Sequence, residues 1–189
     1  FQPAFVHYKS NEVVPKTMFS PKSWGKTDTL ETFMQNELNK GQKPTDEFKF
    51  LINLKPTQIV VAPIIVRGKE DEGVKLWTLS KSQFETFHDK VRSSFHPQTP
   101  PNIWDPKEGY DIIIDVKKGE KYRTYDYSVA RQATPLQGEN ITDDQVQEWL
   151  NDQPSWEEAY TKATNEELKD YLQNYLTEEE EAEEMDEDI

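Results

Sequence analysis

Aromatic and basic residues alternate along residues 121–131, the segment whose residue types best fit a chemical role. If this segment is a β-strand, its side chains point alternately to two faces. One face then carries Lys121, Arg123, Tyr125, Tyr127 and Arg131. Cations neutralise phosphates and flat rings stack on bases, so this mixture is what single-stranded nucleic acid requires of a binding surface. A barrel core surrounded by solubilising cations explains one such strand equally well.

A second segment, 74–78, repeats the pattern, because Lys75 and Trp77 share a face. Two strands with the same mixture favour a binding face over a core. We therefore predict a groove floored by Trp77, Tyr125 and Tyr127. The predicted lining cations are Lys55, Arg67, Lys75, Lys81, Lys121, Arg123 and Arg131.

Signals for catalysis and for metal ions are weak. The chain has no cysteine, and its three histidines are scattered, so we expect no zinc site and no metal. A metal-dependent nuclease using Asp111, Asp115 and Asp126 is a minor alternative, since such acids more often lie on a solvated sheet face. No phosphate-binding loop or nucleophile elbow is present. We expect a protein that is not an enzyme and needs no cofactor.

These residues must be positioned by strands that surround one helix. Apolar runs and alternation predict strands at 1–8, 48–53, 57–67, 74–78, 110–116 and 121–131. Ser80 or Ser82 begins a helix that ends near His96. The order of two strands, a helix and two strands indicates a small barrel. The predicted fold class is mainly β with α additions: a five-stranded barrel with a helical insert at about 9–47 and C-terminal helices.

Helix caps mark the insert and the C-terminal part. Asp28 with Glu31 begins a helix in the insert, and Thr142 and Thr164 begin helices near the end of the chain. Residues 178–188 hold nine acids, and we expect them to be disordered.

The formal charge of −14 is distributed unevenly along the 189 residues. Residues 139–189 contain 19 acids and two bases, leaving 17 acids and 20 bases in residues 1–138. A chain with one strongly acidic end suggests a nucleic-acid or membrane role. No run approaches the roughly 20 apolar residues of a membrane span, so we expect no membrane partner. We predict a binding core at 1–138, a helical segment at 139–176 and a disordered acidic tail at 177–189.

Three motifs resemble one known family. They are GVKLWTLSKSQFETF (Gly73–Phe87), IWDPKEGYDIIID (Ile103–Asp115) and ATPL (Ala133–Leu136), followed by acidic helices and an acidic tail. Their order resembles that of the single-stranded-DNA-binding proteins of tailed phages, the T-even-type helix-destabilising protein family. The likeness covers about half of the chain well.

The resemblance implies an OB-fold that binds single-stranded DNA in phage replication, recombination and repair, in the cytoplasm of the infected bacterial host. By position, Lys75 and Trp77 match the family's strand before the helix, and Arg123, Tyr125 and Tyr127 match the outer face of a later strand. The family can carry a zinc-binding subdomain where residues 9–47 lie. Cysteine ligands are absent here, so we expect a variant without zinc.

The acidic tail resembles the acidic tips of other single-strand binders. The resemblance implies that it competes with DNA for the groove and recruits replication and recombination proteins, with possible self-association on DNA. Its candidate partner-binding residues are Glu183, Glu184, Asp186, Glu187, Asp188 and Ile189. The alternative is an acidic adaptor or DNA-mimic protein, whose acidic segment binds a basic protein instead.

Overall fold

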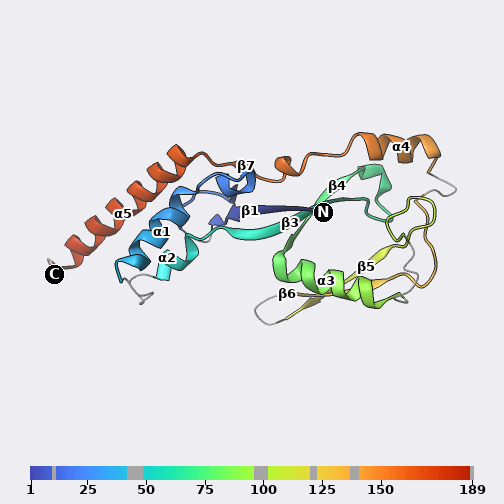
Figure 1. Cartoon of the computed structure of the whole chain (residues 1–189), viewed down its shortest axis with the longest axis horizontal. Coiled ribbons are helices and arrows are strands. Elements are labelled where there is room, and N and C mark those ends of the chain that lie inside the picture. Colours follow the sequence, from blue (N-terminus) through green and yellow to red (C-terminus); the bar gives the residue numbers. More distant parts are fainter. Residues whose placement is uncertain (10–11, 42–48, 96–101, 120–122, 137–140, 188–189) are drawn as a thin grey trace. The chain divides into compact units, whose positions relative to one another are not determined.

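The computed structural model of the chain describes residues 1–9, 12–41, 49–95, 102–119, 123–136 and 141–187 (Figure 1). The chain divides into two compact units. Unit 1 consists of Phe1–Ala62 together with Ser155–Ile189, and unit 2 consists of Pro63–Pro154. Unit 1 is therefore built from both ends of the chain, and unit 2 from its middle.

The strands of unit 1 come from distant parts of the sequence. β1 (Gln2–His7) lies between β2 (Met18–Phe19) and β3 (Thr57–Ile64) and is antiparallel to both. β7 (Thr161–Lys162) pairs in parallel with β2. With β4 (Lys75–Ser80), these strands form a five-stranded sheet of order β4-β3-β1-β2-β7.

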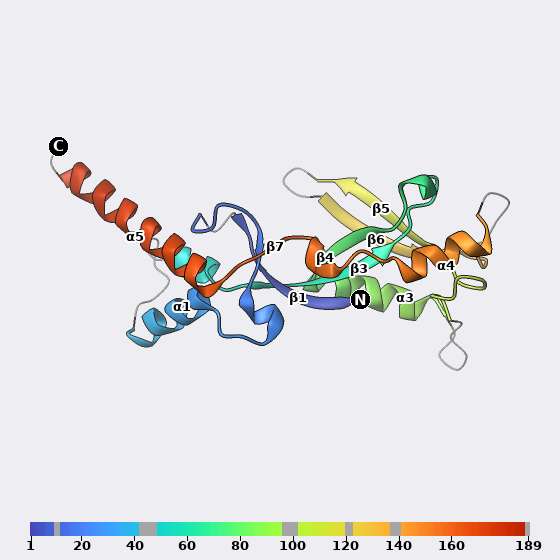
Figure 2. The same cartoon turned by 90° about the horizontal axis from the view of Figure 1, so that it is seen from above.

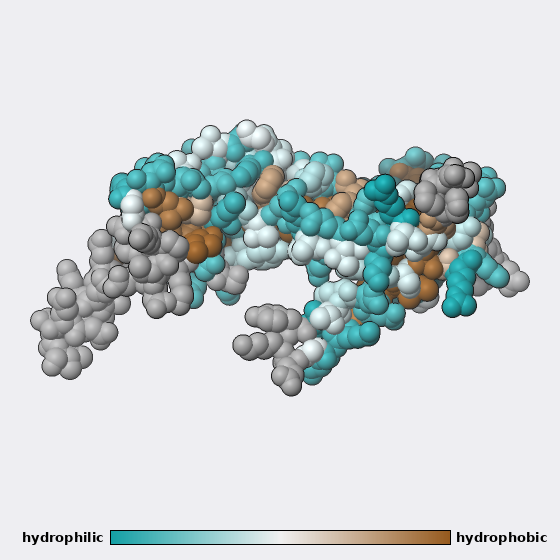
Figure 3. All heavy atoms as spheres, turned by 60° about the horizontal axis from the view of Figure 1, so that its bottom comes forward, coloured by the Kyte–Doolittle hydropathy of each residue, from teal (hydrophilic) through white to brown (hydrophobic). Residues whose placement is uncertain are grey.

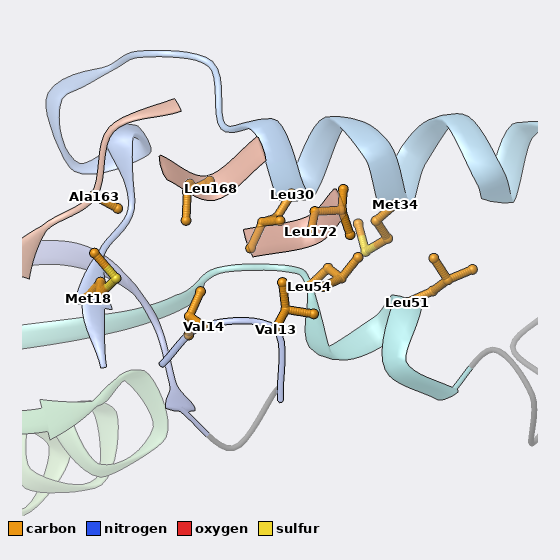
Figure 4. Packing of buried hydrophobic residues seen from close by; sticks show 10 residues of the cluster. All are labelled: Val13, Val14, Met18, Leu30, Met34, Leu51, Leu54, Ala163, Leu168 and Leu172. Carbon is orange, nitrogen blue, oxygen red and sulfur yellow. The ribbon is translucent and has the colours of Figure 1, made fainter. Parts of the chain in front are cut away.

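The hydrophobic core of unit 1 joins three helices, α1 (Thr29–Asn39), α2 (Lys49–Asn53) and α5 (Asn165–Glu187). Figure 4 shows its buried residues, which are Val13, Val14, Met18, Leu30, Met34, Leu51, Leu54, Ala163, Leu168 and Leu172. Leu168 and Leu172 stand one turn apart near the start of α5. Because they are buried here, this end of α5 is part of the fold of unit 1 and not a peripheral addition.

Within unit 1, four residues join the C-terminal part of the chain to the N-terminal part. We call them the aromatic clasp, and they are Trp24, Trp156, Glu157 and Lys162. The rings of Trp24 and Trp156 stack with centroids 5.6 Å apart. Glu157 accepts a hydrogen bond from Nε1 of Trp24 at 3.1 Å and forms an ion pair with Lys162. The Lys162 ammonium lies 4.7 Å from the centre of the Trp24 ring. The clasp therefore combines ring stacking, a cation–π contact and a charge-assisted hydrogen bond.

Three buried polar side chains hold β1 and the end of β2 to the start of α1. Nε2 of His7 lies 2.8 Å from Oδ2 of Asp28, and Ser20 donates a hydrogen bond to the same oxygen at 2.5 Å. The other carboxylate oxygen caps α1 by accepting from the Glu31 amide at 2.9 Å, which confirms Asp28 as the predicted cap. Burial by itself raises the pKa of Asp28, but these hydrogen bonds outweigh it and the pKa is lowered.

The described residues of unit 2 form one long helix, a hairpin and a shorter helix, together with β4. β4 runs directly into α3 (Lys81–Ser93), which begins with a capping box between Ser80 and Gln83 as predicted. β5 (Ile112–Lys118) and β6 (Arg123–Val129) form a separate two-stranded sheet, and α4 (Asp143–Asn151) follows. The core of unit 2 consists of Leu79, Phe87, Val91, Ile103 and Tyr127, with Trp77, Phe84, Phe95, Tyr110, Ile112 and Val129 packed around it.

Two predicted elements differ from the structure. The strand expected at 48–53 is instead the helix α2 over residues 49–53. Its apolar residues Phe50 and Leu51, together with Leu54 just after it, are spaced to meet the core from a helix, so packing overrides the strand signal. The acidic run expected to be disordered is helical to Glu187, as the continuation of α5. Glutamate is a good helix former, and the run follows a helix that is already anchored by its buried leucines.

The fold class is a mixed one, with a five-stranded sheet, helices and a separate hairpin. The boundaries of the two compact units differ from the domain boundaries predicted at 138 and 176. The roles predicted for those domains remain predictions. Among the described residues, no helix is both long and apolar enough to span a membrane.

Candidate nucleic-acid interface

The β5–β6 hairpin carries the segment that the sequence singled out. Its strands are antiparallel, with Ile114 opposite Tyr127, Val116 opposite Tyr125, and Lys118 opposite Arg123. Because directly opposite residues share a face, these six side chains lie on the same face of the hairpin. We call this surface the hairpin face. The alternation predicted from sequence is confirmed.

Exposure changes along the hairpin face. At its base, Tyr127 is 4% exposed and packs edge-on against Phe87 with ring centroids 5.6 Å apart. Two residues nearer the turn, Tyr125 is 39% exposed, and Val116 opposite it is 55% exposed. The face then ends in the exposed side chains of Lys118 and Arg123. One strand face therefore passes from core to solvent within about two residue pairs.

Of the three predicted stacking residues, Tyr127 belongs to the core of unit 2 and Trp77 packs against that core. Tyr127 is buried, and this burial, with a smaller effect from Tyr125, raises its pKa. Trp77 is half-buried, with its ring edge against Phe87 at 5.4 Å and tilted toward Tyr127 at 6.2 Å. The buried ring of Tyr127 has no free face for a base, so Tyr127 is removed from the predicted floor, whereas Trp77 remains a predicted stacking residue. Of the three, Tyr125 presents the most exposed ring.

The predicted cations have different environments. Arg67 binds both carboxylate oxygens of Asp111 at 3.1 Å and donates to the backbone oxygens of Thr134 and Pro135 at 2.8 and 2.7 Å. These bonds tie the segment after β6 to the residue that precedes β5, so Arg67 has a structural role. Its contact with phosphate remains a prediction.

Other predicted cations remain accessible. Lys75 is ion-paired with Glu72 at 2.5 Å, and Lys81 lies 3.9 Å from Glu85. Both pairs are exposed, so they offer little resistance to a competing phosphate. Arg123 and Arg131 are exposed.

The structure does not test two of the predicted cations. Lys55 is exposed in unit 1, between α2 and β3. Lys121 lies outside the described residues.

Lys118 was missed by sequence reasoning, although it faces Arg123 across the hairpin and is exposed. The predicted strands end at 116 and begin again at 121, which leaves Lys118 between them, where the sequence reads Lys-Lys-Gly-Glu. The register could have identified it, since a strand pair that places Val116 opposite Tyr125 must place Lys118 opposite Arg123. Figure 3 shows mainly hydrophilic side chains on the part of the hairpin that leads to the turn, which is drawn in grey.

The three acids considered for a metal site do not form one cluster. Asp111 is held by Arg67, whereas Asp115 and Asp126 face each other as a cross-strand pair, with Lys90 of α3 3.5 Å from Asp126. Among the described residues, no group of three or more potential ligands could hold a metal ion.

The predicted partner-binding acids lie at the end of the chain. Glu183, Glu184, Asp186 and Glu187 are in the last turns of α5. Asp188 and Ile189 lie outside the described residues.

Comparison with protein-family models, curated proteins and solved structures finds no significant match for this chain.

Proposed function

We propose that the chain binds single-stranded DNA without sequence preference, and that the hairpin face of unit 2 is the main contact. The observation that carries this proposal is the exposed ring of Tyr125. It shares the hairpin face with Arg123 and with Lys118, which lies opposite Arg123. A ring next to a pair of cations can stack on one base while the cations contact neighbouring phosphates. Binding of this kind reads no base edges, so it tolerates any sequence.

The hairpin is also anchored well enough to present this face. Its base is fixed by Tyr127 in the core, and Arg67 ties the segment after β6 to Asp111. A fixed base leaves only the outer half free to meet a strand, which limits the ordering cost of binding. Lys75 and Lys81 add exposed positive charge from β4 and α3 of the same unit.

The wider role follows from the sequence resemblance. It supports an OB-fold and a part in phage DNA replication, recombination and repair within the bacterial cytoplasm. The acidic end supports a regulatory function, because a segment of −17 joined to a body of +3 can compete with DNA for cations on the same chain. The proposed role is binding and not catalysis, and replication or recombination proteins would meet the acidic end.

One observation favours a second candidate, an acidic adaptor or DNA mimic. The acids after Leu176 continue a helix whose first turns are anchored in unit 1, so their backbone is presented in an ordered form. An ordered acidic helix suits a basic protein partner.

The two candidates are separated by one titration. The full chain is added to labelled oligo-dT and to a duplex of equal length, at low and at moderate salt, and fluorescence anisotropy is followed. The proposal expects binding to the single strand that weakens as salt rises, with weaker binding to the duplex. No anisotropy change at micromolar protein rejects it and leaves the adaptor, whereas magnesium-dependent cleavage of the oligonucleotide indicates a nuclease.

A further inference from the structure

The outer edge of β5 has no neighbouring strand in the described part of the chain. β5 and β6 form a sheet of two strands, and α3 packs against β6. Figure 2 shows β6 between β5 and α3. The side chains of β5 from Ile113 to Lys118 are all exposed. An edge of this kind offers a row of backbone N–H and C=O groups to another strand.

The order of charges on β5 selects a partner. Two antiparallel copies of one strand are related by a twofold axis perpendicular to the sheet, so one residue must face its own copy. With Val116 on the axis, Asp115 of each copy lies opposite Lys117 of the other. A shift of the axis by one residue places Asp115 against Asp115, or Lys117 against Lys117. Charge therefore favours the register centred on Val116.

Within the hairpin, neither Asp115 nor Lys117 lies opposite a residue of the opposite charge. Asp115 lies opposite Asp126, a residue of the same charge, and Lys117 lies opposite the neutral Thr124. Lys90 stands 3.5 Å from Asp126 on the β6 side. A second copy would supply opposite charges to Asp115 and Lys117 from the open side, and it would cover Val116, which is 55% exposed.

We propose that the β5 edge is a self-association surface, on which two copies of the chain pair β5 with β5 antiparallel about Val116. The product is a four-stranded sheet of order β6-β5-β5-β6. The hairpin face remains on a face of this sheet, so self-association is compatible with the proposed DNA binding but does not depend on it. With Val116 on the axis, five residues of each β5, 114–118, pair with the other copy, so the contact is short and the dimer is correspondingly weak.

Sedimentation equilibrium of the full chain without DNA tests this proposal, between about 1 µM and about 1 mM protein, where small interfaces associate. The wild type should dimerise with rising concentration. Asp115→Lys and Lys117→Asp should each weaken the dimer at least about tenfold, because each places like charges opposite one another twice. The double variant D115K/K117D should recover the wild-type constant, since it has the same net charge and restores both pairs.

A wild type that stays monomeric throughout this range overturns the proposal. So does a double variant that dimerises no better than the single variants, because the register would then play no part.

Oxidative cross-linking gives a second readout, since the chain has no cysteine of its own. In Val116→Cys the two thiols meet at the axis, and a disulfide-linked dimer should form on mild oxidation. Thr124→Cys is the matched control, because it is exposed on β6 and distant from the β5 edge. Equal cross-linking of the two variants, or none in Val116→Cys, contradicts the proposed register.

Discussion

Tyr125 and Tyr127 lie two residues apart on the same face of β6, but Tyr125 is 39% exposed and Tyr127 is 4% exposed. The hairpin face is therefore continuous with the core of unit 2 at one end and with solvent at the other. Only its outer half can meet a ligand. The proposed function depends on this division, and it predicts opposite behaviour for the two tyrosines.

The inner residues should respond as core residues. We predict that Tyr127→Ala lowers the free energy of unfolding by about 3–5 kcal/mol, as expected when a large buried aromatic side chain is removed. Trp77→Ala should also destabilise, by a smaller amount, because its ring is half-buried against Phe87. Urea unfolding followed by circular dichroism measures both.

Thr124→Ala, at an exposed position of β6, is the matched control and should stay within about 0.5 kcal/mol of the wild type. If Tyr127→Ala matches this control in stability but loses DNA binding, the burial argument for Tyr127 is wrong.

Sequence reasoning found the hairpin, its alternation and the shared face of Arg123, Tyr125 and Tyr127. It could not find where along that face the core ends, because a period of two residues is the same in buried and exposed parts of a strand. The depth of Tyr127 is set by Phe87 of α3, which is distant in sequence. The ion pair between Arg67 and Asp111 could not be predicted either, because these two residues are also distant in sequence.

The remaining differences have related causes. α2 was expected to be a strand because short apolar runs fit either structure, and only packing with the core of unit 1 decides between them. The helix caps at Asp28, Ser80, Thr142 and Thr164 were correctly predicted, since a cap depends on a few neighbouring residues. Local signals were thus read well, and long-range packing was not.

The cations of the hairpin face should act through salt-dependent binding. We predict that Lys118→Gln and Arg123→Gln each reduce the slope of log K against log salt by about 0.7, the value for one lost phosphate contact on a single strand. Arg92→Gln is the control, since Arg92 is an exposed cation on α3 and outside this face. The measurement is oligo-dT titration at four salt concentrations. Equal slopes for the three variants would remove these two cations from the interface.

The buried carboxylate of Asp28 should make stability depend on pH. Its pKa is lowered in the folded protein, so it contributes stability that is present above the unfolded pKa of about 3.9 and is lost as pH falls through the folded value. In Asp28→Asn we expect a loss of about 1–3 kcal/mol at neutral pH, with a flatter decline below about pH 4. Asp89→Asn, at an exposed site on α3, should keep the wild-type profile. An unchanged acid profile in Asp28→Asn contradicts this role.

The anchored first turns of α5 should be needed for folding, whereas the acids after Leu176 should not. A chain ending at Leu176 keeps the aromatic clasp and the buried residues of α5, so we predict that it folds like the wild type. It should also bind oligo-dT more tightly at low salt, with the difference shrinking as salt rises, because it lacks the competing acids.

A chain ending at Pro154 lacks the clasp, Leu168 and Leu172, and it should lose the structure of unit 1 in circular dichroism. Unchanged affinity of the chain ending at Leu176, at every salt concentration, would rule out competition by the acidic end.

The most direct test of the central claim compares Tyr125→Ala with Tyr125→Phe in titrations of labelled oligo-dT. Loss of one stacked base costs about 1–3 kcal/mol, so Tyr125→Ala should bind about 5- to 150-fold more weakly while unfolding like the wild type. Tyr125→Phe keeps the ring and should bind like the wild type. If Tyr125→Ala binds oligo-dT as tightly as the wild type, the hairpin face is not the DNA-binding surface.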